Sequence, residues 1–460
     1  MKKQLLFTST FICLLASIYF LPLNLSAQRI ACGAQHSLFI CRDSSANAWG
    51  SNQFGELGNG TNFSNIPLAV QSINGVTSIG GALNHSIALK DDSTVWAWGY
   101  NGQGELGNGT TVNTNIPTQV IGLSHITAIS SMFHSLALRD DSIVLAWGYN
   151  GYGELGNAAA GGSSSVPVPV NGLTSATHIS CAYYHSLAIK NDSTVWAWGG
   201  SPGNGINTVS DVAIQITGLR EVIAVAGGNS FSLALKKDST VWAWGSNNEG
   251  ELGNGSASLS YTPVQVIGLT GVVAITAGTY HALALKQDGT VLSWGYNGFG
   301  QLGNGSITDS HVPVLVVGLS GVVQIAAGYG HSVAMKNDTT VWTWGYNNYG
   351  QLGNGTNTNS LIPILATGVC AHVIAVEELA DPKNISVFPN PSTGSFIVKS
   401  AEFIGTGKIE LFNSTGAKMY SENVFNTSSI SIDLKNYSSG IYFLKIIADK
   451  KYYSKKITIN

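Results

Sequence analysis

Histidine recurs at one position of a repeating pattern in this chain, and a ring of imidazoles could bind a metal ion. The fifth copy of the pattern has Phe231 at that position. No two of the histidines lie close enough in sequence to chelate a metal as a local pair. We therefore interpret them as structural residues that hydrogen-bond to neighbouring loops, and we predict no metal site: His36, His85, His134, His185, His281 and His331.

An acidic position recurs with the same period and could supply the paired carboxylates of an acid–base enzyme. Two copies have glutamine there, so the position needs a hydrogen bond and not a charge. The chain also lacks the Gly-x-Ser-x-Gly, His-Glu-x-x-His and Cys-x-x-Cys motifs. We predict a protein without catalytic activity or cofactor. The acidic position holds Glu56, Glu105, Glu154, Glu251, Gln301 and Gln351.

Both series belong to a unit of about 50 residues that occurs seven times and is marked by Trp-Gly. The last copy reads as strands "VVQIAAG" (322–328), "HSVAMK" (331–336) and "TVWTWG" (340–345), a Gly/Asn-rich loop and a strand around "IPILATG". Four short strands with a recurring tryptophan are typical of a propeller blade. The sequence predicts an all-β fold: a seven-bladed β-propeller of four-stranded blades, followed by a small β-sandwich.

Each third strand has two positions for tryptophan, spaced by two, whose side chains point the same way. The second position is tryptophan in every copy, and the two positions together account for all eleven tryptophans. Leucine can replace tryptophan in packing but not in stacking on a ligand, so we expect these residues in the core between blades. The first position holds Asn47, Trp96, Leu145, Trp196, Trp242, Leu292 and Trp342.

The charge of the chain and its first 27 residues restrict the classes of function that the protein can have. Charged residues make up 10% of the chain and the net charge is −3, which leaves no basic stripe for nucleic acid. Residues 1–27 combine Lys2 and Lys3 with an apolar run and end in Leu25-Ser26-Ala27, as in a cleaved secretory signal peptide. An uncleaved membrane anchor is the alternative. No further membrane span is visible, so we expect none in the mature chain.

Four cysteines remain after the predicted signal peptide, and export would allow them to pair. Cys32 and Cys181 share a repeat position at which other copies have Gly, Ser or Ala, which indicates a small buried slot. The sequence leaves the disulfide state of Cys32, Cys41, Cys181 and Cys370 open.

The strand order places two sets of loops at the same end of every blade. Residues in these loops vary between copies and are often aromatic, which suits a binding surface. The alternative is that they are ordinary loop residues that pack on one another. The predicted ligand-binding residues are Phe54, Phe133, Tyr152, Tyr183, Tyr184, Tyr280, Phe299, Tyr329 and Tyr349.

The repeat "GxxHSxALKxDxTVWAWGxNxxGELGNGT" resembles that of the regulator-of-chromosome-condensation family of seven-bladed propellers, over residues 28–378. That family includes a nuclear exchange factor for a small GTPase and a secreted inhibitor of β-lactamase, so the resemblance does not select a function. The export signal and the lack of a basic tail argue against a nuclear role. The segment "HVIAVEE" (372–378) looks like an eighth copy of the first strand, and either closes the ring or caps the last blade.

The C-terminal part has a different pattern, with alternating strands such as "ISVFPNPSTGSFIV" (385–398) and "SSGIYFLKI" (438–446). Residues 385–460 resemble the C-terminal sorting domain of type IX secretion substrates in Bacteroidetes, with residues 379–384 as linker. The resemblance implies export by the type IX machinery, followed by secretion or attachment to the outer-membrane surface. We expect the propeller to bind an unknown protein or surface macromolecule. The alternatives are a surface adhesin for glycans and a polysaccharide-degrading enzyme.

Overall fold

The computed structural model describes residues 28–61, 63–159, 161–200, 208–370, 385–413, 418–434, 437–448 and 451–459. All regular elements in these ranges are β-strands. None of the described segments forms a helix with the length and hydropathy needed to cross a membrane. The predicted signal peptide (1–27), the linker (379–384) and the segment 372–378 lie outside the described residues, as do residues 201–207 of the fourth blade.

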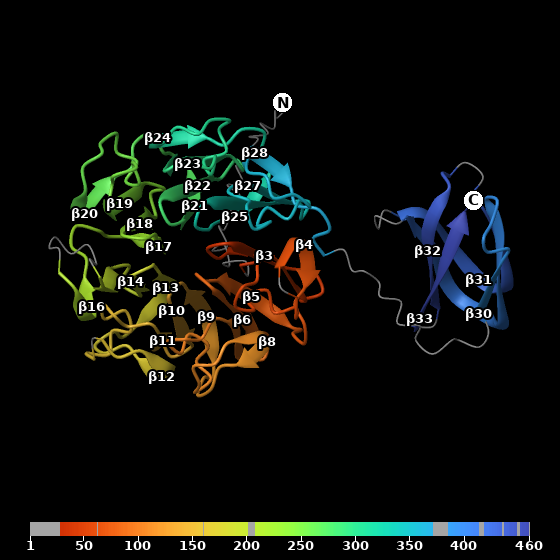
Figure 1. The fold of residues 1–460 in the computed structure, drawn as a ribbon, viewed down its shortest axis with the longest axis horizontal. Coiled ribbons are helices and arrows are strands. Elements are labelled where there is room, and N and C mark those ends of the chain that lie inside the picture. The colour runs from red at the N-terminus through yellow and green to blue at the C-terminus, as the bar shows by residue number, and fades with distance from the viewer. Residues whose placement is uncertain are drawn as a thin grey trace, which may run out of the picture.

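Twenty-eight strands form seven four-stranded antiparallel sheets, each made of consecutive strands (Figure 1). Blades 1 and 2 contain β1 (Ile30–Cys32), β2 (His36–Ile40), β3 (Ala46–Ser51), β4 (Phe63–Ala69), β5 (Val76–Gly81), β6 (His85–Lys90), β7 (Val95–Gly99) and β8 (Thr114–Gln119). Blades 3 and 4 contain β9 (Ile126–Ser131), β10 (His134–Arg139), β11 (Val144–Gly148), β12 (Ser164–Pro169), β13 (Ala176–Cys181), β14 (His185–Lys190), β15 (Val195–Gly199) and β16 (Ser210–Gln215).

The remaining blades repeat this arrangement. Blade 5 contains β17 (Val222–Gly227), β18 (Phe231–Lys236), β19 (Val241–Gly245) and β20 (Ser260–Gln265). Blades 6 and 7 contain β21 (Val272–Ala277), β22 (His281–Lys286), β23 (Val291–Gly295), β24 (Ser310–Leu315), β25 (Val322–Ala327), β26 (His331–Lys336), β27 (Val341–Gly345) and β28 (Ser360–Leu365). The blades surround a common centre, and β1 lies against β25 and β26, which closes the ring (Figure 1).

The core lies between adjacent blades. One cluster joins Leu38 and Leu57 of blade 1 to Val76 and Trp98 of blade 2, and the other blade pairs repeat it. The second tryptophan of each third strand is at most 1% exposed. The Trp98 indole N–H donates to the Glu56 carbonyl of the preceding blade at 2.8 Å, and Trp49, Trp147, Trp198, Trp294 and Trp344 make the corresponding bond. The prediction that this position forms the core is confirmed.

The first tryptophan position lies at the edge of this core, and its tryptophans are less deeply buried than those of the second position. Trp96 is only half-buried, its indole N–H donates to the Thr94 hydroxyl, and the Lys90 ammonium lies 5.6 Å from the ring centroid. Corresponding lysines cover Trp196, Trp242 and Trp342. Trp96, Trp196, Trp242 and Leu292 nevertheless pack against the clusters between blades, and Leu145 is buried, so this position belongs to the expected core but lies less deep in it.

A disulfide joins the first and last blades. Cys41 follows β2 and pairs with Cys370, at a sequence separation of 329. The side-chain oxygen of Asn47 accepts the Cys370 N–H at 2.6 Å, so Asn47 at the tryptophan position holds the incoming chain end. Cys32 and Cys181 are unpaired and buried, as a small buried slot requires.

The C-terminal domain contains β29 (Ile385–Phe388), β30 (Ser395–Asn413), β31 (Lys418–Asp433), β32 (Gly440–Ala448) and β33 (Lys451–Ile459). The strand order is β29-β30-β32-β33, and β31 pairs with β30. The pairing of β30 with β31 shifts between Lys399 and Ile404, which divides the long strands into two parts. These parts enclose a core that includes Phe396, Ile409 and Leu444, as expected for a small β-sandwich.

Candidate binding surface

The recurring histidines join neighbouring blades through serines. Each imidazole Nε2 lies 2.6–3.1 Å from the hydroxyl of a serine on the second strand of the next blade. The last blade bonds to the first in the same way, so the series runs around the ring. The pairs are His36–Ser86, His85–Ser135, His134–Ser186, His185–Ser232, His281–Ser332 and His331–Ser37.

Four of these histidines are neutral hydrogen-bond donors, because their serine partners donate to backbone carbonyls: His36, His134, His281 and His331. The Ser86 hydroxyl donates to the Glu56 carbonyl at 2.8 Å, so it must accept the Nε2–H of His36. Burial lowers the pKa of His36 to about 3 and acts in the same direction on the others. The interpretation as structural histidines agrees with this geometry, although the partner is a strand serine and not a loop.

Blade 5 lacks the histidine, and blade 6 lacks its partner. Phe231 replaces the histidine, and Ala282 stands where the other second strands have serine. Both residues are buried. Because both residues change together, an apolar contact joins blades 5 and 6 at the place where a histidine–serine hydrogen bond joins the other blades.

We expect Ser332→Ala to lower the free energy of unfolding by about 1–3 kcal/mol, because it leaves buried His281 without its partner. Adding His281→Phe should restore most of that loss, since the pair then matches Phe231 and Ala282. Gly278 occupies the same repeat position as Gly228, whose missing side chain leaves room for the Phe231 ring. A phenylalanine at position 281 would therefore find the same space. Chemical denaturation of the wild type, both single variants and the double variant measures the coupling. Simply additive losses would contradict this account.

The recurring acidic position has a local structural role. Glu105 accepts the backbone N–H of Gln103 at 2.8 Å, and Gln301 accepts that of Phe299 at 3.0 Å in the same way. Burial raises the pKa of Glu105 and Glu154 to about 7. Glutamate and glutamine accept the same backbone hydrogen bond, which agrees with the prediction that this position needs a hydrogen bond.

The predicted aromatic residues lie at the end of the blades where the second strands begin. In blades 3 and 4, Phe133 stacks on Tyr184 with a centroid distance of 5.6 Å. Tyr152 meets Tyr184 edge-on at 5.2 Å, and Phe133 meets Tyr183 at 5.4 Å. The structure therefore brings these four residues into one cluster.

A second cluster covers blades 6 and 7. Tyr280 meets Tyr329 at 6.3 Å between centroids. Phe299 and Tyr349 are joined through Tyr346, at 4.6 and 6.2 Å. Phe54 of blade 1 stands apart from both clusters, and it contacts Tyr100 at 5.1 Å.

Hydrogen bonds link the two clusters across blade 5. Thr279 donates to the Tyr183 hydroxyl at 2.7 Å, and the Asn229 side-chain amide donates to the Tyr280 hydroxyl at 3.2 Å. Tyr183 is only 6% exposed, so it supports this surface and does not offer a contact. Tyr152 and Tyr349, in contrast, are 43% and 40% exposed.

Sequence reasoning missed four aromatic residues of this surface. Each directly follows a Trp-Gly pair, and this shared position is the signal that could have revealed them. Tyr296, for example, connects Tyr280 and Phe299 through centroid distances of 6.4 and 5.8 Å. We define the aromatic surface as the nine predicted residues together with Tyr100, Tyr149, Tyr296 and Tyr346.

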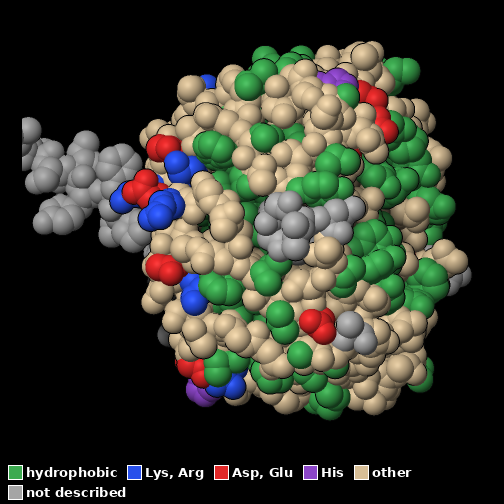
Figure 2. Space-filling view, turned by 90° about the vertical axis from the view of Figure 1, so that its left-hand side faces the viewer, with side chains coloured by type: hydrophobic (Ala, Val, Ile, Leu, Met, Phe, Trp, Pro, Cys, Tyr) green, Lys and Arg blue, Asp and Glu red, His purple; other side chains and the backbone are tan. Residues whose placement is uncertain are grey.

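The two ends of the blades differ in chemistry. Lysine–aspartate pairs such as Lys90–Asp92 and Lys236–Asp238 lie in the turns after the second strands, away from the aromatic surface. In a view from the side of the propeller, most of the charged side chains in sight lie along the left edge, and the rest of the face carries patches of hydrophobic side chains with a few acidic ones (Figure 2).

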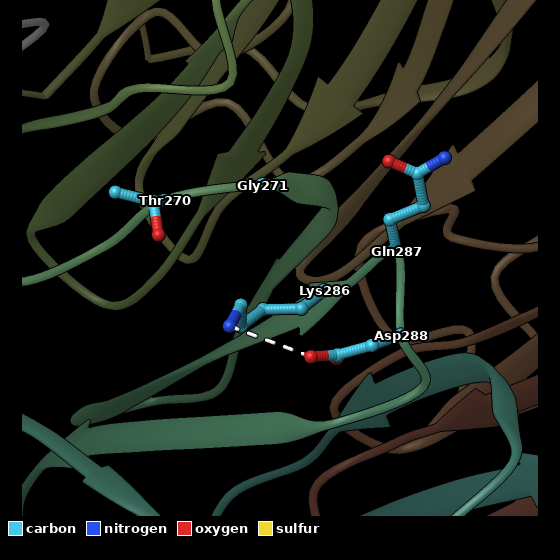
Figure 3. A pocket seen from close by; sticks show the side chains of 5 residues that line it. All are labelled: Thr270, Gly271, Lys286, Gln287 and Asp288. Atoms are coloured by element: carbon cyan, nitrogen blue, oxygen red, sulfur yellow. Dashed lines mark ion pairs between the residues drawn. The ribbon is translucent and has the colours of Figure 1, made fainter.

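A shallow depression of about 350 Å³ lies at the charged end (Figure 3). Its lining side chains include Lys286 and Asp288, which point toward each other with 3.5 Å between the ammonium nitrogen and a carboxylate oxygen. These charges neutralise each other, and no aromatic residue lines the depression. The aromatic surface is therefore the stronger candidate for binding.

Comparison with known proteins agrees with this architecture. A family model described as the regulator of chromosome condensation (RCC1) repeat matches residues 48–89, 92–138, 141–189, 238–285, 288–335 and 338–377. A second model of the same description begins at residue 28. The model of the secretion system C-terminal sorting domain matches residues 386–460.

Solved structures of similar fold include Prp20p from Saccharomyces cerevisiae, 21% identical, with a TM-score of 0.63 over 79% of this chain and 89% of that one. Human WBSCR16 is 23% identical, with a TM-score of 0.60 over 67% of this chain and 86% of that one. At these identities the likeness shows the fold alone.

Among curated proteins, ulvan lyase NLR42 of Nonlabens ulvanivorans is 35% identical over 79 residues. This match covers 17% of the present chain and only 14% of the lyase. The repeat matches, in contrast, span more than half of the chain. The chain therefore belongs to the regulator of chromosome condensation (RCC1) repeat family, and its secretion system C-terminal sorting domain directs it through type IX secretion to the cell surface or the extracellular space.

Proposed function

We propose that the propeller is a non-catalytic binding module that recognises another protein through the aromatic surface. The observation that carries this proposal is the linked set of partly exposed tyrosine and phenylalanine rings on blades 3, 4, 6 and 7. Such rings offer a large contact area at a low cost in conformational entropy. Their mutual contacts hold them in place before a partner binds.

The recurring polar groups do not favour an enzyme. The histidines and the acidic position are committed to hydrogen bonds within and between blades. The similarity to an ulvan lyase covers 17% of this chain, which does not support a transfer of its activity. A glycan adhesin is the competing binding role, and it is separated from protein binding by the experiment below.

The test compares the mature chain, residues 28–460, with the variant Phe133→Ala/Tyr184→Ala/Tyr280→Ala. Both are used to capture proteins from culture medium and are applied to a glycan array. We expect a protein that the wild type retains and the variant loses. The matched control is Ile223→Ala/Val273→Ala/Val323→Ala, which removes three exposed apolar side chains near the opposite ends of the inner strands. Equal capture by both variants, or signals on the glycan array alone, would refute the proposal.

A further inference from the structure

Six of the seven outer strands carry a residue that protects them from pairing with a further strand. The fourth strand of each blade forms one edge of its sheet and lies on the rim of the ring (Figure 1). Proline has no backbone N–H, and edge strands with proline resist the addition of another strand. One position of the fourth strand is proline in six blades: Pro67, Pro117, Pro167, Pro263, Pro313 and Pro363.

Blade 4 is the exception, because its outer strand β16 has Ala213 at this position. The pairing of the strands fixes the correspondence. Ser210, three residues before Ala213, pairs with the glycine that ends β15, as Ser260 pairs with the glycine that ends β19 in blade 5. The Ala213 side chain packs against the core between blades 3 and 4. Its backbone therefore supplies an N–H group at a place where the other outer strands have none.

The backbone groups of β16 alternate between its partner strand and the open edge of the sheet. Ile214 pairs with a residue of β15, and the Ile216 N–H donates to a carbonyl of the same strand at 2.8 Å. Successive backbone groups point to opposite sides of a strand, so those of Ala213 and Gln215 face the open edge. In the described part of the chain, β16 is the last strand of its sheet.

This open edge is complementary to a second copy of itself. No charged residue occurs between Val212 and Leu219, so two copies of the segment can approach without repulsion between like charges. In an antiparallel arrangement about a two-fold axis, Ala213 of each copy lies opposite Gln215 of the other. Each of these two pairs can exchange two backbone hydrogen bonds. Ile214 then lies opposite Ile214 of the second copy, as an apolar cross-strand pair.

We propose that β16 pairs with β16 of a second copy of this chain and joins two propellers into a symmetric dimer. This inference is independent of the proposed function. The fourth strand begins at the end of the blade that carries the aromatic surface, because the second strand begins there and the strands alternate in direction. An antiparallel pair inverts the second copy. The dimer therefore presents its two aromatic surfaces in opposite directions.

The other blades provide the substitution that tests this pairing. Ala213→Pro gives β16 the residue of the six other outer strands, so the fold should tolerate it, and it removes an N–H from the open edge. The matched control is Ala213→Ser, which keeps this N–H and differs from the wild type by one oxygen atom. Thermal denaturation checks that both variants are folded.

Sedimentation equilibrium of the mature chain, residues 28–460, measures the association. A contact through one short strand buries little surface, so we expect a dimer with a Kd on the order of 100 µM for the wild type and for Ala213→Ser. Ala213→Pro should weaken association at least about tenfold. Hydrogen–deuterium exchange locates the contact, because the peptide that contains Ala213 and Gln215 should exchange more slowly in the wild-type dimer than in the diluted monomer.

Three results would show that the inference is wrong. The wild type remains monomeric at about 1 mM, ten times the expected Kd. Ala213→Pro associates as strongly as the wild type, or Ala213→Ser loses association to the same extent as Ala213→Pro. Loss of association in Phe133→Ala/Tyr184→Ala/Tyr280→Ala alone would place the contact between copies at the aromatic surface instead. None of the first three results affects the proposed function, because capture of a partner protein does not require a dimer.

Discussion

Replacing Cys41 and Cys370 together with serine should lower the free energy of unfolding of the propeller by roughly 3–5 kcal/mol. The disulfide closes a loop with a sequence separation of 329, so it strongly restricts the unfolded chain. It also joins the two blades that no short loop connects. Without the disulfide, the segment around Cys370 is held against blade 1 only by non-covalent contacts, such as the hydrogen bond from the Cys370 N–H to Asn47.

Tryptophan fluorescence during denaturation in guanidinium measures this loss. All eleven tryptophans lie in the propeller, so the signal does not report on the C-terminal domain. A reductant should destabilise the wild type by a similar amount and should leave the double serine variant unchanged. The control is Cys32→Ala, which places the alanine of other copies in the buried slot and should retain sensitivity to the reductant. A wild type that is insensitive to reductant would rule out this role for the disulfide.

The repeat predicted the blades well but not the joint between the first and last. Blades, strand order and the buried tryptophan follow from a pattern that seven copies share. The joint depends on residues that break the pattern. Cys41 stands where other copies have lysine or arginine, and Asn47 stands where they have tryptophan or leucine. Blade 1 therefore lacks the lysine–tryptophan contact that Lys90 and Trp96 make in blade 2. In its place, Cys41 forms the disulfide with Cys370 and Asn47 accepts the Cys370 N–H.

The candidate site was predictable in its location but not in its connections. Alternation of strands placed the variable loops at one end of the blades, and the structure agrees. Contacts such as Thr279 with Tyr183 join blade 6 to blade 4, and a linear repeat alignment contains no information on such distances.

The two tryptophans of one strand show where the alternation rule stops. Trp96 and Trp98 point to the same side of β7. Trp98 is 0% exposed and lies between blades 1 and 2, whereas Trp96 is half-buried beneath Lys90 near the turn. The rule gives the side of the sheet, while the depth depends on the distance from the end of the strand. Depth determines how much apolar area a substitution exposes.

Trp98→Ala should therefore lower the free energy of unfolding by about 3–5 kcal/mol, and Trp96→Ala by only about 1 kcal/mol. The first substitution opens a cavity between blades and removes the donor to the Glu56 carbonyl. The second removes a side chain that water already reaches on one face. Gly58 adds to the difference, because it lies against the Trp98 ring and has no side chain that could fill the space.

The pair is its own control, since both variants lose one indole from the same strand. Denaturation in guanidinium, followed by the fluorescence of the other ten tryptophans, compares them under identical conditions. Phenylalanine at position 98 should recover part of the loss, because it restores apolar volume but not the indole donor. Equal losses for Trp96→Ala and Trp98→Ala would mean that the stability of the ring does not reside in the contacts between blades.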